Sequence, residues 1–226
     1  MKKAEIEARR AARLEAEKQR VAGMLEFERK YLDYGYTAVC GIDEAGRGPL
    51  AGPVVAAAVI LDINDPILYV NDSKKLSEKK RESLYDEIIA RAVSVGVGIK
   101  NPEIIDEINI LQADYEAMRD AISGLSVCPD ILLNDAVTIP EVDIKQVAII
   151  KGDAKSLSIA AASIIAKVTR DRIMLELDAR YPEYGFARNK GYGTAEHIAA
   201  LKEFGPAPVH RKTFIGHFTD PDKVVR

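Results

Sequence analysis

The chain has 226 residues, of which 47% are hydrophobic and 30% are charged, and its formal net charge is −3. This length suits one ordinary globular domain with an appendage, and no apolar run approaches the roughly 20 residues that span a bilayer. The slightly acidic balance argues against a generally basic nucleic-acid binder, and the charged start at Lys2 and Lys3 predicts no signal peptide. We therefore expect a cytoplasmic, monomeric protein that does not associate with membranes.

Charge is distributed unevenly along the chain. Residues 1–30 contain nine Lys or Arg and six Glu, a local charge of +3, and residues 186–217 contain five Lys or Arg and two Glu, again +3. The rest of the chain must then carry −9 to give the total of −3. An acidic centre flanked by basic ends suits a metal site beside a phosphate-binding surface.

The first 33 residues predict a helix, because they are rich in Ala, Glu, Arg and Lys and contain no Pro and one Gly. Apolar side chains gather only at the end of this stretch, so we expect a solvated helix that docks by its C-terminal end. The residues that offer an apolar stripe are Val21, Met24, Leu25, Phe27, Tyr31 and Leu32. We divide the chain into an N-terminal helical extension, residues 1–34, and a main domain, residues 35–226.

The main domain alternates strands and helices, which predicts an α/β layer fold. Strands are expected at Thr37–Asp43, Pro53–Leu61, Val93–Ile99, Ile131–Leu133 and Gln146–Ile150. Helices are expected from Ser77 to about Ala92, from Pro102 to Ser123 with a break, over Ser156–Arg180, and from Thr194 or Ala195 to Phe204. The two cysteines, Cys40 and Cys128, lack metal-ligand spacing, so we expect both to be buried free thiols in a reducing compartment.

Four acidic residues share one placement, at or just beyond the end of an apolar strand. They are Asp43, Glu44, Asp135 and Asp153. Strand ends on one edge of an α/β sheet converge, and like carboxylates brought together repel one another unless a cation neutralises them. Oxygen ligands without His or Cys suit Mg²⁺ or Mn²⁺ rather than zinc. Each acid taken alone is equally well explained as the end of a strand or the cap of a turn.

The run Gly46-Arg47-Gly48 follows the first two acids directly. Glycines allow a backbone to approach a ligand closely, and an arginine supplies fixed donors for a phosphate. Gly-rich turns are common, and the value of this one comes from its position beside two candidate metal ligands.

The segment Gly41–Val54, which reads GIDEAGRGPLAGPV, resembles the signature of the ribonuclease HII family. Further segments follow in the family's order: Asn71–Lys74, Leu132–Ala136, Lys151–Asp153, Ala161–Lys167, Lys190–Tyr192 and His210-Arg211. The resemblance covers roughly residues 35–217 and leaves the N-terminal helix outside. It implies the ribonuclease H fold, a five-stranded mixed sheet with helices on both sides.

The resemblance also implies roles for the candidate residues. The four carboxylates would bind two Mg²⁺ or Mn²⁺ ions during catalysis, about 4 Å apart, that activate a water and stabilise the leaving 3′-oxygen. Gly46, Arg47 and Gly48 would clasp the ribonucleotide and its 2′-hydroxyl, with Tyr192 beside them, while Lys74, Ser163 and Lys167 are candidates for phosphate contacts. Each of these last four residues has an ordinary alternative as a surface or packing side chain.

One residue departs from the family pattern, because Asn134 precedes the third carboxylate where the family usually has an apolar residue. An amide at this point is capable of reorienting Asp135 or of bonding within the strand. The histidines His197, His210 and His217 lack metal-ligand spacing, and we expect them at the surface or in contact with backbone.

Three functions remain open from the sequence. The first is an endoribonuclease that cuts the RNA strand of RNA–DNA hybrids and incises 5′ to single ribonucleotides in duplex DNA, leaving 3′-hydroxyl and 5′-phosphate ends. The second is a ribonuclease HIII-like enzyme that cuts only within RNA tracts, and the third is a non-catalytic module that binds hybrid duplex. Gly46-Arg47-Gly48 with Tyr192 favours the first over the second, and the intact carboxylate set disfavours the third.

Overall fold

A computed structural model of the chain describes residues 2–219, and the side chains from residue 4 onward. Met1 and residues 220–226, which belong to the two predicted segments, lie outside this description. The chain forms two compact units, each assembled from three stretches of sequence. Unit 1 comprises residues 1–43, 58–95 and 125–164, and unit 2 comprises residues 44–57, 96–124 and 165–226.

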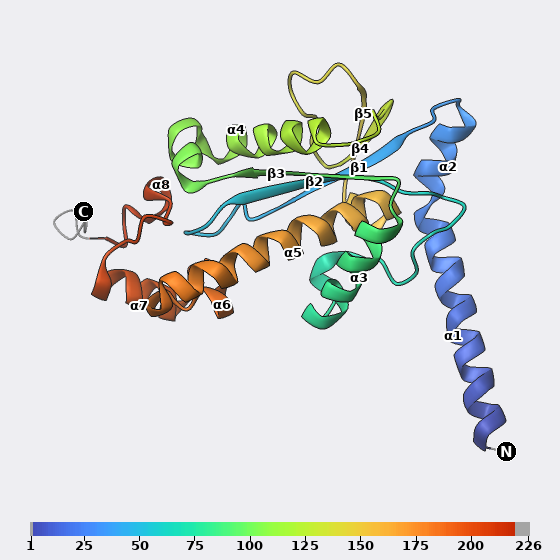
Figure 1. The fold of residues 1–226 in the computed structure, drawn as a ribbon, viewed down its shortest axis with the longest axis horizontal. Coiled ribbons are helices and arrows are strands. Elements are labelled where there is room, and N and C mark those ends of the chain that lie inside the picture. Colours follow the sequence, from blue (N-terminus) through green and yellow to red (C-terminus); the bar gives the residue numbers. More distant parts are fainter. Residues whose placement is uncertain (1, 220–226) are drawn as a thin grey trace. The chain divides into compact units, whose positions relative to one another are not determined.

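The strands form one five-stranded sheet in the order β3-β2-β1-β4-β5, which confirms the predicted number of strands (Figure 1). They are β1 Val39–Ala45, β2 Val54–Ile60, β3 Ser94–Lys100, β4 Ile131–Asp135 and β5 Lys145–Ile149. All seven residues of β2 are buried, as its continuous apolar run predicts for a strand covered on both faces. The sheet is mixed and flanked by helices, as expected.

Three strands of unit 1 run parallel, and their register decides where the acids fall. Ile42 of β1 pairs with Asn134 of β4, and Asp135 of β4 pairs with Ile149 of β5. Asp43 and Asp135 are therefore the next residues along two neighbouring parallel strands. The expectation that the carboxyl ends of these strands meet at one edge of the sheet is confirmed.

The predicted N-terminal helix is divided at Leu25 into α1 and α2, and the other helices begin and end close to the predicted positions. The principal ones are α1 Lys2–Met24, α2 Glu26–Asp33, α3 Glu78–Arg91, α4 Pro102–Ser123, α5 Leu157–Arg180 and α7 Ala195–Phe204. Short turns of helix are η1 Ser73–Lys75, η2 Gly152–Ala154, η3 Pro182–Tyr184, α6 Phe186–Asn189 and α8 Lys212–Ile215. Ser77 caps α3 and Thr194 caps α7 through their side-chain oxygens, and the expected break in α4 lies at Asn109, with φ +67°.

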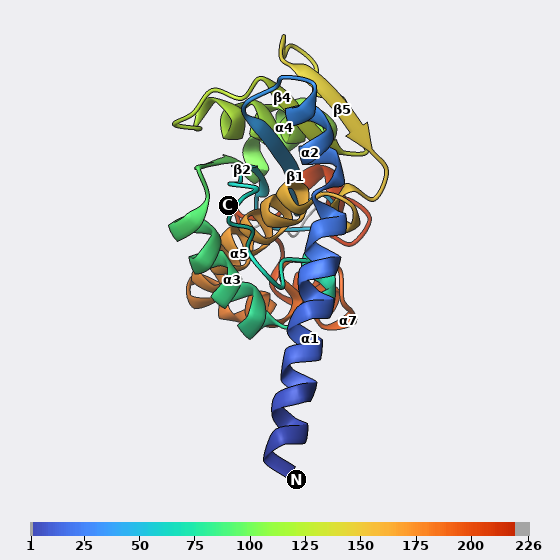
Figure 2. The ribbon, with the colours of Figure 1, turned by 90° about the vertical axis from the view of Figure 1, so that its right-hand side faces the viewer.

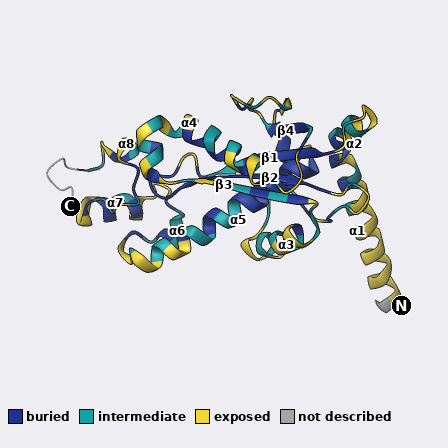
Figure 3. Ribbon diagram, turned by 45° about the horizontal axis from the view of Figure 1, so that its top comes forward, coloured by how far each residue is buried: buried dark blue, intermediate teal, exposed yellow. Residues whose placement is uncertain are grey.

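The core of unit 1 depends on a close approach between β1 and the first turn of α5. A Cβ placed on Gly41 would stand 2.1 Å from the carbonyl carbon of Ser158, so no larger residue fits there. Ala160, Ala161 and Ala162 in the same helix are all fully buried. Figure 3 shows β1 and β2 as mostly buried.

Most of α1 is exposed, and the helix extends away from the strands of unit 1 (Figures 1 and 2). Val21, Met24 and Leu25 at its end are buried, which confirms docking by the C-terminal end. α2 is held by Glu28, whose side chain is 1% exposed. Its Oε1 accepts hydrogen bonds from the Ser156 hydroxyl (2.6 Å) and the Ser158 backbone N–H (2.9 Å) at the start of α5. Burial raises the pKa of Glu28 despite these bonds.

One expectation about the cysteines is wrong. Cys40 is buried, and burial raises the pKa of its thiol to about 12, but Cys128 is exposed. Cys128 lies in the turn between α4 and β4, where no strand or helix covers it. Among residues 2–219 no helix is both long and apolar enough to cross a membrane.

We predict that residues 1–16 and residues 17–33 differ sharply in their contribution to stability. Deleting residues 1–16, whose described side chains are exposed, should change the free energy of unfolding by less than about 0.5 kcal/mol. Deleting residues 1–33 also removes Glu28 and the apolar side chains packed on β1 and β4, and should cost at least about 2 kcal/mol. Urea unfolding of the two truncations and the full chain measures this. Equal losses in both would refute the prediction.

Candidate active site

The carboxyl edge of the parallel strands in unit 1 gathers three of the four predicted acids. Asp43 lies within β1, Asp135 ends β4, and Asp153 lies in η2 directly after β5. The backbone N–H of Gly152 donates to Oδ1 of Asp135 at 2.7 Å, which ties η2 to the end of β4. Asp43 and Asp153 are buried, at 7% and 9% exposure, and Asp135 is partly exposed.

The electrostatics of this edge show that the acids act on one another. Burial raises the pKa of Asp153, and the charges of Asp72 and Asp135 raise it further, while Lys74 opposes them. Burial lowers the pKa of Lys74, but Asp43, Asp153, Asp72 and Asp135 together raise it above its usual value. Lys74 is therefore an ammonium group held in the field of these carboxylates.

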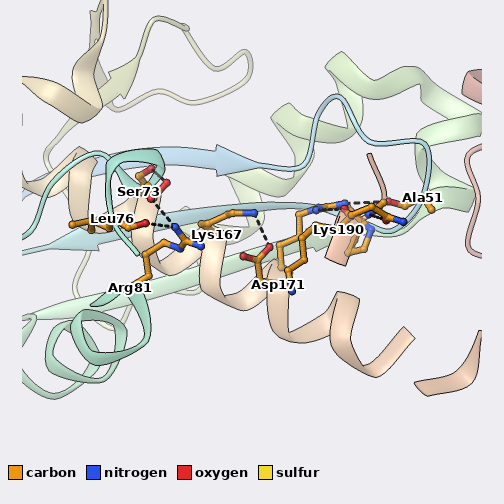
Figure 4. A network of polar contacts seen from close by, with 12 residues as sticks. Ala51, Ser73, Leu76, Arg81, Lys167, Asp171 and Lys190 are labelled. Carbon is orange, nitrogen blue, oxygen red and sulfur yellow. Dashed lines mark hydrogen bonds and ion pairs between the residues drawn. The ribbon is translucent and has the colours of Figure 1, made fainter. Parts of the chain in front are cut away.

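Lys74 is placed by the short helix η1. The Asp72 side chain accepts from the Lys74 backbone N–H at 2.9 Å, and Arg81 donates to the carbonyl oxygens of Ser73 and Leu76 (Figure 4). The hydroxyls of Ser73 and Ser163 are hydrogen-bonded at 2.9 Å, and both residues are 4% exposed. Ser163 thus anchors η1 from α5 and does not face solvent.

Asn134 does not disturb the neighbouring carboxylate. Its Nδ2 donates to the Gln146 side-chain oxygen at 2.8 Å and to the Val137 carbonyl at 3.2 Å, and Asn134 is fully buried. Successive side chains of a strand point to opposite faces, so this amide lies on the other face of β4 from Asp135. The amide therefore bonds to the neighbouring strand β5 and to the loop after β4, and not within β4 itself.

The donor set of this edge fits a hard divalent cation. It consists of carboxylate oxygens in a negative field, the chemistry that Mg²⁺ and Mn²⁺ prefer. Among the described residues, no three His, Cys, Asp or Glu side chains stand close enough to hold one ion as they are. Mg²⁺ is usually held by one or two carboxylates, waters and substrate phosphates, so a preformed protein cage is not required. The four-carboxylate ligand set stays a prediction.

In unit 2, the loop between β1 and β2 is held by two buried arginines. Arg211 is fully buried and donates to the carbonyl oxygens of Gly46 (2.6 Å), Arg47 (2.9 Å) and Gly52 (2.9 and 3.0 Å). Arg170 is 1% exposed and donates to the carbonyls of Pro53, Ala51 and Lys190 at 2.9 to 3.0 Å; Ala51 and Lys190 are labelled in Figure 4. Both arginines therefore hold backbone, and burial lowers their pKa values, to about 9 for Arg211 and about 10 for Arg170.

The same clamp explains the first glycine of the loop. Gly46 has φ +100°, and a Cβ there would stand 2.1 Å from Nε of Arg170. Gly48 and Arg47 are exposed, and the place of a Gly48 Cβ would be 3.8 Å from Cε1 of Tyr192. Tyr192 is 48% exposed, and its ring lies beside Gly48.

Arg47 contacts two acids of unit 2. Its Nη1 lies 3.6 Å from Oε1 of Glu44, and its Nε lies 3.4 Å from Oδ2 of Asp114. Asp114 is on α4 and is fully buried. Burial raises the pKa of Asp114, with Glu44 adding to the shift and Arg47 opposing it. The fourth predicted acid thus shares an arginine with an acid that the sequence did not single out.

A pair of buried histidines holds the backbone of Tyr192 by hydrogen bonding. Nδ1–H of His197 donates to the Tyr192 carbonyl at 2.9 Å, which leaves Nε2 of His197 to accept from Nε2–H of His210 at 3.0 Å. Nδ1 of His210 accepts from the Ala207 backbone N–H at 3.0 Å. Both histidines contact backbone, as expected, but they are 0% and 2% exposed and not at the surface, whereas His217 is exposed.

The remaining predicted phosphate contact, Lys167, is on α5. Its ammonium pairs with Asp171 one turn along the helix at 2.7 Å, and Asp171 is 5% exposed (Figure 4). This pairing gives Lys167 a structural role in the free protein.

Sequence reasoning gave no role to Arg170, Arg211, Asp114 or the paired histidines. His210-Arg211 is one of the segments that follow in the family's order, which gives it no specific role. Arg170 lies within the predicted helix Ser156–Arg180, whose pattern does not distinguish it from other helical residues. Their partners lie far away in sequence, 159 residues in the case of Arg211 and Gly52. No local spacing rule connects such residues.

The histidine pair predicts a specific pH dependence of stability. Burial lowers the pKa of His210 from 6.5 to about 4, and burial also lowers that of His197. Between these pH values the unfolded chain binds more protons than the folded chain. The free energy of unfolding should therefore fall as pH drops from 6.5 towards about 4. Thermal melting across this range should show a smaller slope for His210→Gln than for wild type. The exposed His217→Gln serves as control, and a slope unchanged in His210→Gln would contradict the prediction.

Comparison with known proteins agrees with the geometry. The family model for Ribonuclease HII matches residues 40–217. A curated ribonuclease HII from Lachnoclostridium phytofermentans is 65% identical over 210 residues, 93% of this chain and 82% of its own. The ribonuclease HII of Clostridioides difficile is 54% identical over 208 residues, 92% of this chain and 82% of its own.

Solved structures show the same fold. The ribonuclease H2 of Pyrococcus horikoshii superposes with a TM-score of 0.66 and 30% identity, covering 80% of this chain and 99% of its own. The ribonuclease HII of Archaeoglobus fulgidus, solved in complex with PCNA, gives 0.64 and 30%, covering 79% and 94%. The signature from Gly41 to Val54, the parallel strands that end in acids, and a family match over most of the length lead to one conclusion: the chain belongs to the ribonuclease HII family and is an endoribonuclease.

Proposed function

We propose that this endoribonuclease cuts the RNA strand of RNA–DNA hybrids and incises duplex DNA on the 5′ side of a single embedded ribonucleotide. The observation that carries the proposal is the set of acids at the carboxyl edge of β1, β4 and β5, with Lys74 in their field. A metal-dependent nuclease uses such carboxylates to hold cations against a phosphodiester. Next to it in the chain comes the loop that is suited to recognising a ribose.

The proposed cofactor is Mg²⁺ or Mn²⁺, bound by Asp43, Glu44, Asp135 and Asp153. When bound, the cations would supply Lewis-acid activation of a water and stabilise the charge that develops on the leaving 3′-oxygen. The Gly152 N–H keeps Asp135 oriented, and the Lys74 ammonium offsets the carboxylate charge and offers a donor to a phosphate oxygen. Water adds to phosphorus as the bond to the 3′-oxygen breaks, which leaves a 3′-hydroxyl and a 5′-phosphate.

Recognition is assigned to Gly46, Arg47, Gly48 and Tyr192. The 2′-hydroxyl distinguishes RNA from DNA at a single position, and an exposed backbone without side chains can approach it closely. The Tyr192 ring beside Gly48 offers a stacking surface. Because the buried guanidiniums of Arg170 and Arg211 hold this loop through its carbonyls, its shape is set before substrate binds.

Two other functions compete with this one. A ribonuclease HIII-like enzyme would cut only within RNA tracts; Bst ribonuclease HIII, solved with Mn²⁺, has a TM-score of 0.58 at 17% identity, which is a likeness of fold alone. A non-catalytic module would bind hybrid duplex equally well in chelator. The geometry of Tyr192 against Gly48 favours recognition of a single ribonucleotide over the first alternative.

We predict that Asp43→Asn loses at least about 100-fold in cleavage rate, because the amide removes charge that stabilises the transition state. The substrate is a DNA duplex with one ribonucleotide in one strand, assayed with Mg²⁺ and with Mn²⁺. Asp143→Asn, an exposed acid of unit 1, is the matched control and should keep wild-type activity.

The same assay separates the alternatives. Wild-type protein should make a single cut 5′ to the ribonucleotide, and only with metal present. Cutting of RNA tracts but not of the single ribonucleotide would establish the ribonuclease HIII-like alternative. Binding without cleavage in either metal would establish the non-catalytic one, and near-full activity of Asp43→Asn would end the assignment of that acid.

A further prediction concerns Tyr192. Tyr192→Ala should lower the ratio of single-ribonucleotide to long-hybrid cleavage by roughly tenfold, because stacking on an aromatic ring contributes about 1–3 kcal/mol per base. Its metal requirement should stay unchanged, since the ring contacts substrate and not cation. Tyr34→Ala removes a tyrosine that is 69% exposed in unit 1 and serves as control. An unchanged cleavage ratio would make Tyr192 a packing residue.

A further inference from the structure

Asp114 is a buried acid with unusual surroundings. It lies on α4, its side chain is 0% exposed, and neither Oδ1 nor Oδ2 has a hydrogen-bond partner in the structure. Its Oδ2 forms an ion pair with Nε of Arg47 at 3.4 Å. A buried carboxylate of this kind costs stability, and an apolar side chain of similar volume would cost less. The fold therefore gains little from an acid here, which points to a role in the chemistry of Arg47.

Arg47 lies between two acids that compete for it. Nε faces Asp114 at 3.4 Å, Nη1 faces Glu44 at 3.6 Å, and neither ion pair uses Nη2. Both distances are longer than a good hydrogen bond, so neither acid holds the guanidinium completely. The Arg47 side chain is 42% exposed, and the carbonyl of Arg47 is fixed by Arg211. Arg47 is thus fixed at its backbone carbonyl, whereas its guanidinium is shared between Glu44 and Asp114.

We propose that Asp114 is a positioning residue that draws Arg47 away from Glu44, so that Glu44 stays available to a divalent cation and Arg47 to the substrate. The inference rests on the proposed metal role of Glu44. If Asp114 is removed, Glu44 becomes the only acid of this triad that can pair with Arg47. A closer Glu44–Arg47 pair would neutralise the carboxylate and compete with the cation for its oxygens.

The test measures Mn²⁺ binding to the free protein by titration calorimetry, and therefore does not depend on activity. Asp114→Ala should raise the Kd for Mn²⁺ roughly tenfold, because a closer Glu44–Arg47 pair would compete with the cation for the Glu44 oxygens. Asp114→Asn should fall between this variant and wild type, because the amide keeps a polar oxygen near Nε of Arg47 but loses the negative charge. Asp120→Ala is the matched control: Asp120 lies on the same helix, pairs with Lys100 at 2.9 Å, and its replacement should leave the Kd unchanged.

A double-mutant cycle with Arg47→Ala decides whether Asp114 acts through Arg47. In the Arg47→Ala background, replacing Asp114 should change the Kd for Mn²⁺ by less than about twofold, since no guanidinium is left to collapse on Glu44. A loss that persists there would mean that Asp114 attracts the cation directly through its own charge, and would overturn the proposal. So would a wild-type Kd in Asp114→Ala. If Asp114→Ala does not fold, the same cycle with the isosteric Asp114→Asn gives the decision.

Substrate kinetics supply a second, separate readout. Asp114→Asn should raise KM for the single-ribonucleotide duplex more than it lowers kcat at saturating Mn²⁺, because Arg47 is displaced while the reacting groups remain. A fall in kcat alone would contradict positioning through Arg47. Failure of wild type to cleave any ribonucleotide-containing duplex would instead reject the proposed function, and the calorimetric result on Asp114 would stand apart from it.

Discussion

Repulsion among acids is the constraint on which the candidate site depends. The parallel pairing of β1, β4 and β5 places Asp43, Asp135 and Asp153 at one edge of the sheet. Burial raises the pKa of Asp153, and the charges of Asp72 and Asp135 raise it further. The fold tolerates this repulsion because η1 brings Lys74 into the same field. Two contacts hold η1 in place: the hydrogen bond between the hydroxyls of Ser73 and Ser163, and the hydrogen bond that Arg81 donates to the Ser73 carbonyl. Ser163, a candidate phosphate contact in the sequence, thus supports the short helix that carries Lys74.

In unit 2, two buried arginines hold the loop between β1 and β2. Arg170 and Arg211 are buried, and both donate hydrogen bonds to several backbone carbonyls. A guanidinium offers five donors in a fixed plane, which suits it to hold several carbonyls of one loop at once. The carbonyls of Gly46, Arg47 and Gly52 are thereby turned towards the protein. The Gly46–Gly48 segment is then rigid before any ligand arrives, which reduces the ordering cost of binding.

The predictions that succeeded concerned local chemistry. Helix boundaries at Ser77 and Thr194 followed from side-chain caps, and the acids at strand ends followed from the alternation of apolar runs and turns. One that failed concerned burial, since Cys128 is exposed although cysteine is usually buried. His197 and His210 contact backbone as expected, and the structure adds that both are buried. The hydroxyl of Ser163 is hydrogen-bonded to that of Ser73, 90 residues away, which agrees with the packing alternative left open for it.

The family, the acids at the ends of strands and the glycine-arginine-glycine loop can all be predicted from the sequence, because each depends on residues that are neighbours along the chain. The groups that support them are known only from the tertiary structure. Arg170 meets Pro53 across 117 residues, and Arg47 meets Asp114 from a different element. Whether a buried charge is met by a carbonyl, a carboxylate or nothing depends on how distant segments pack. No periodicity along the chain encodes that, since the desolvation that gives such contacts their energy exists only once the fold has closed.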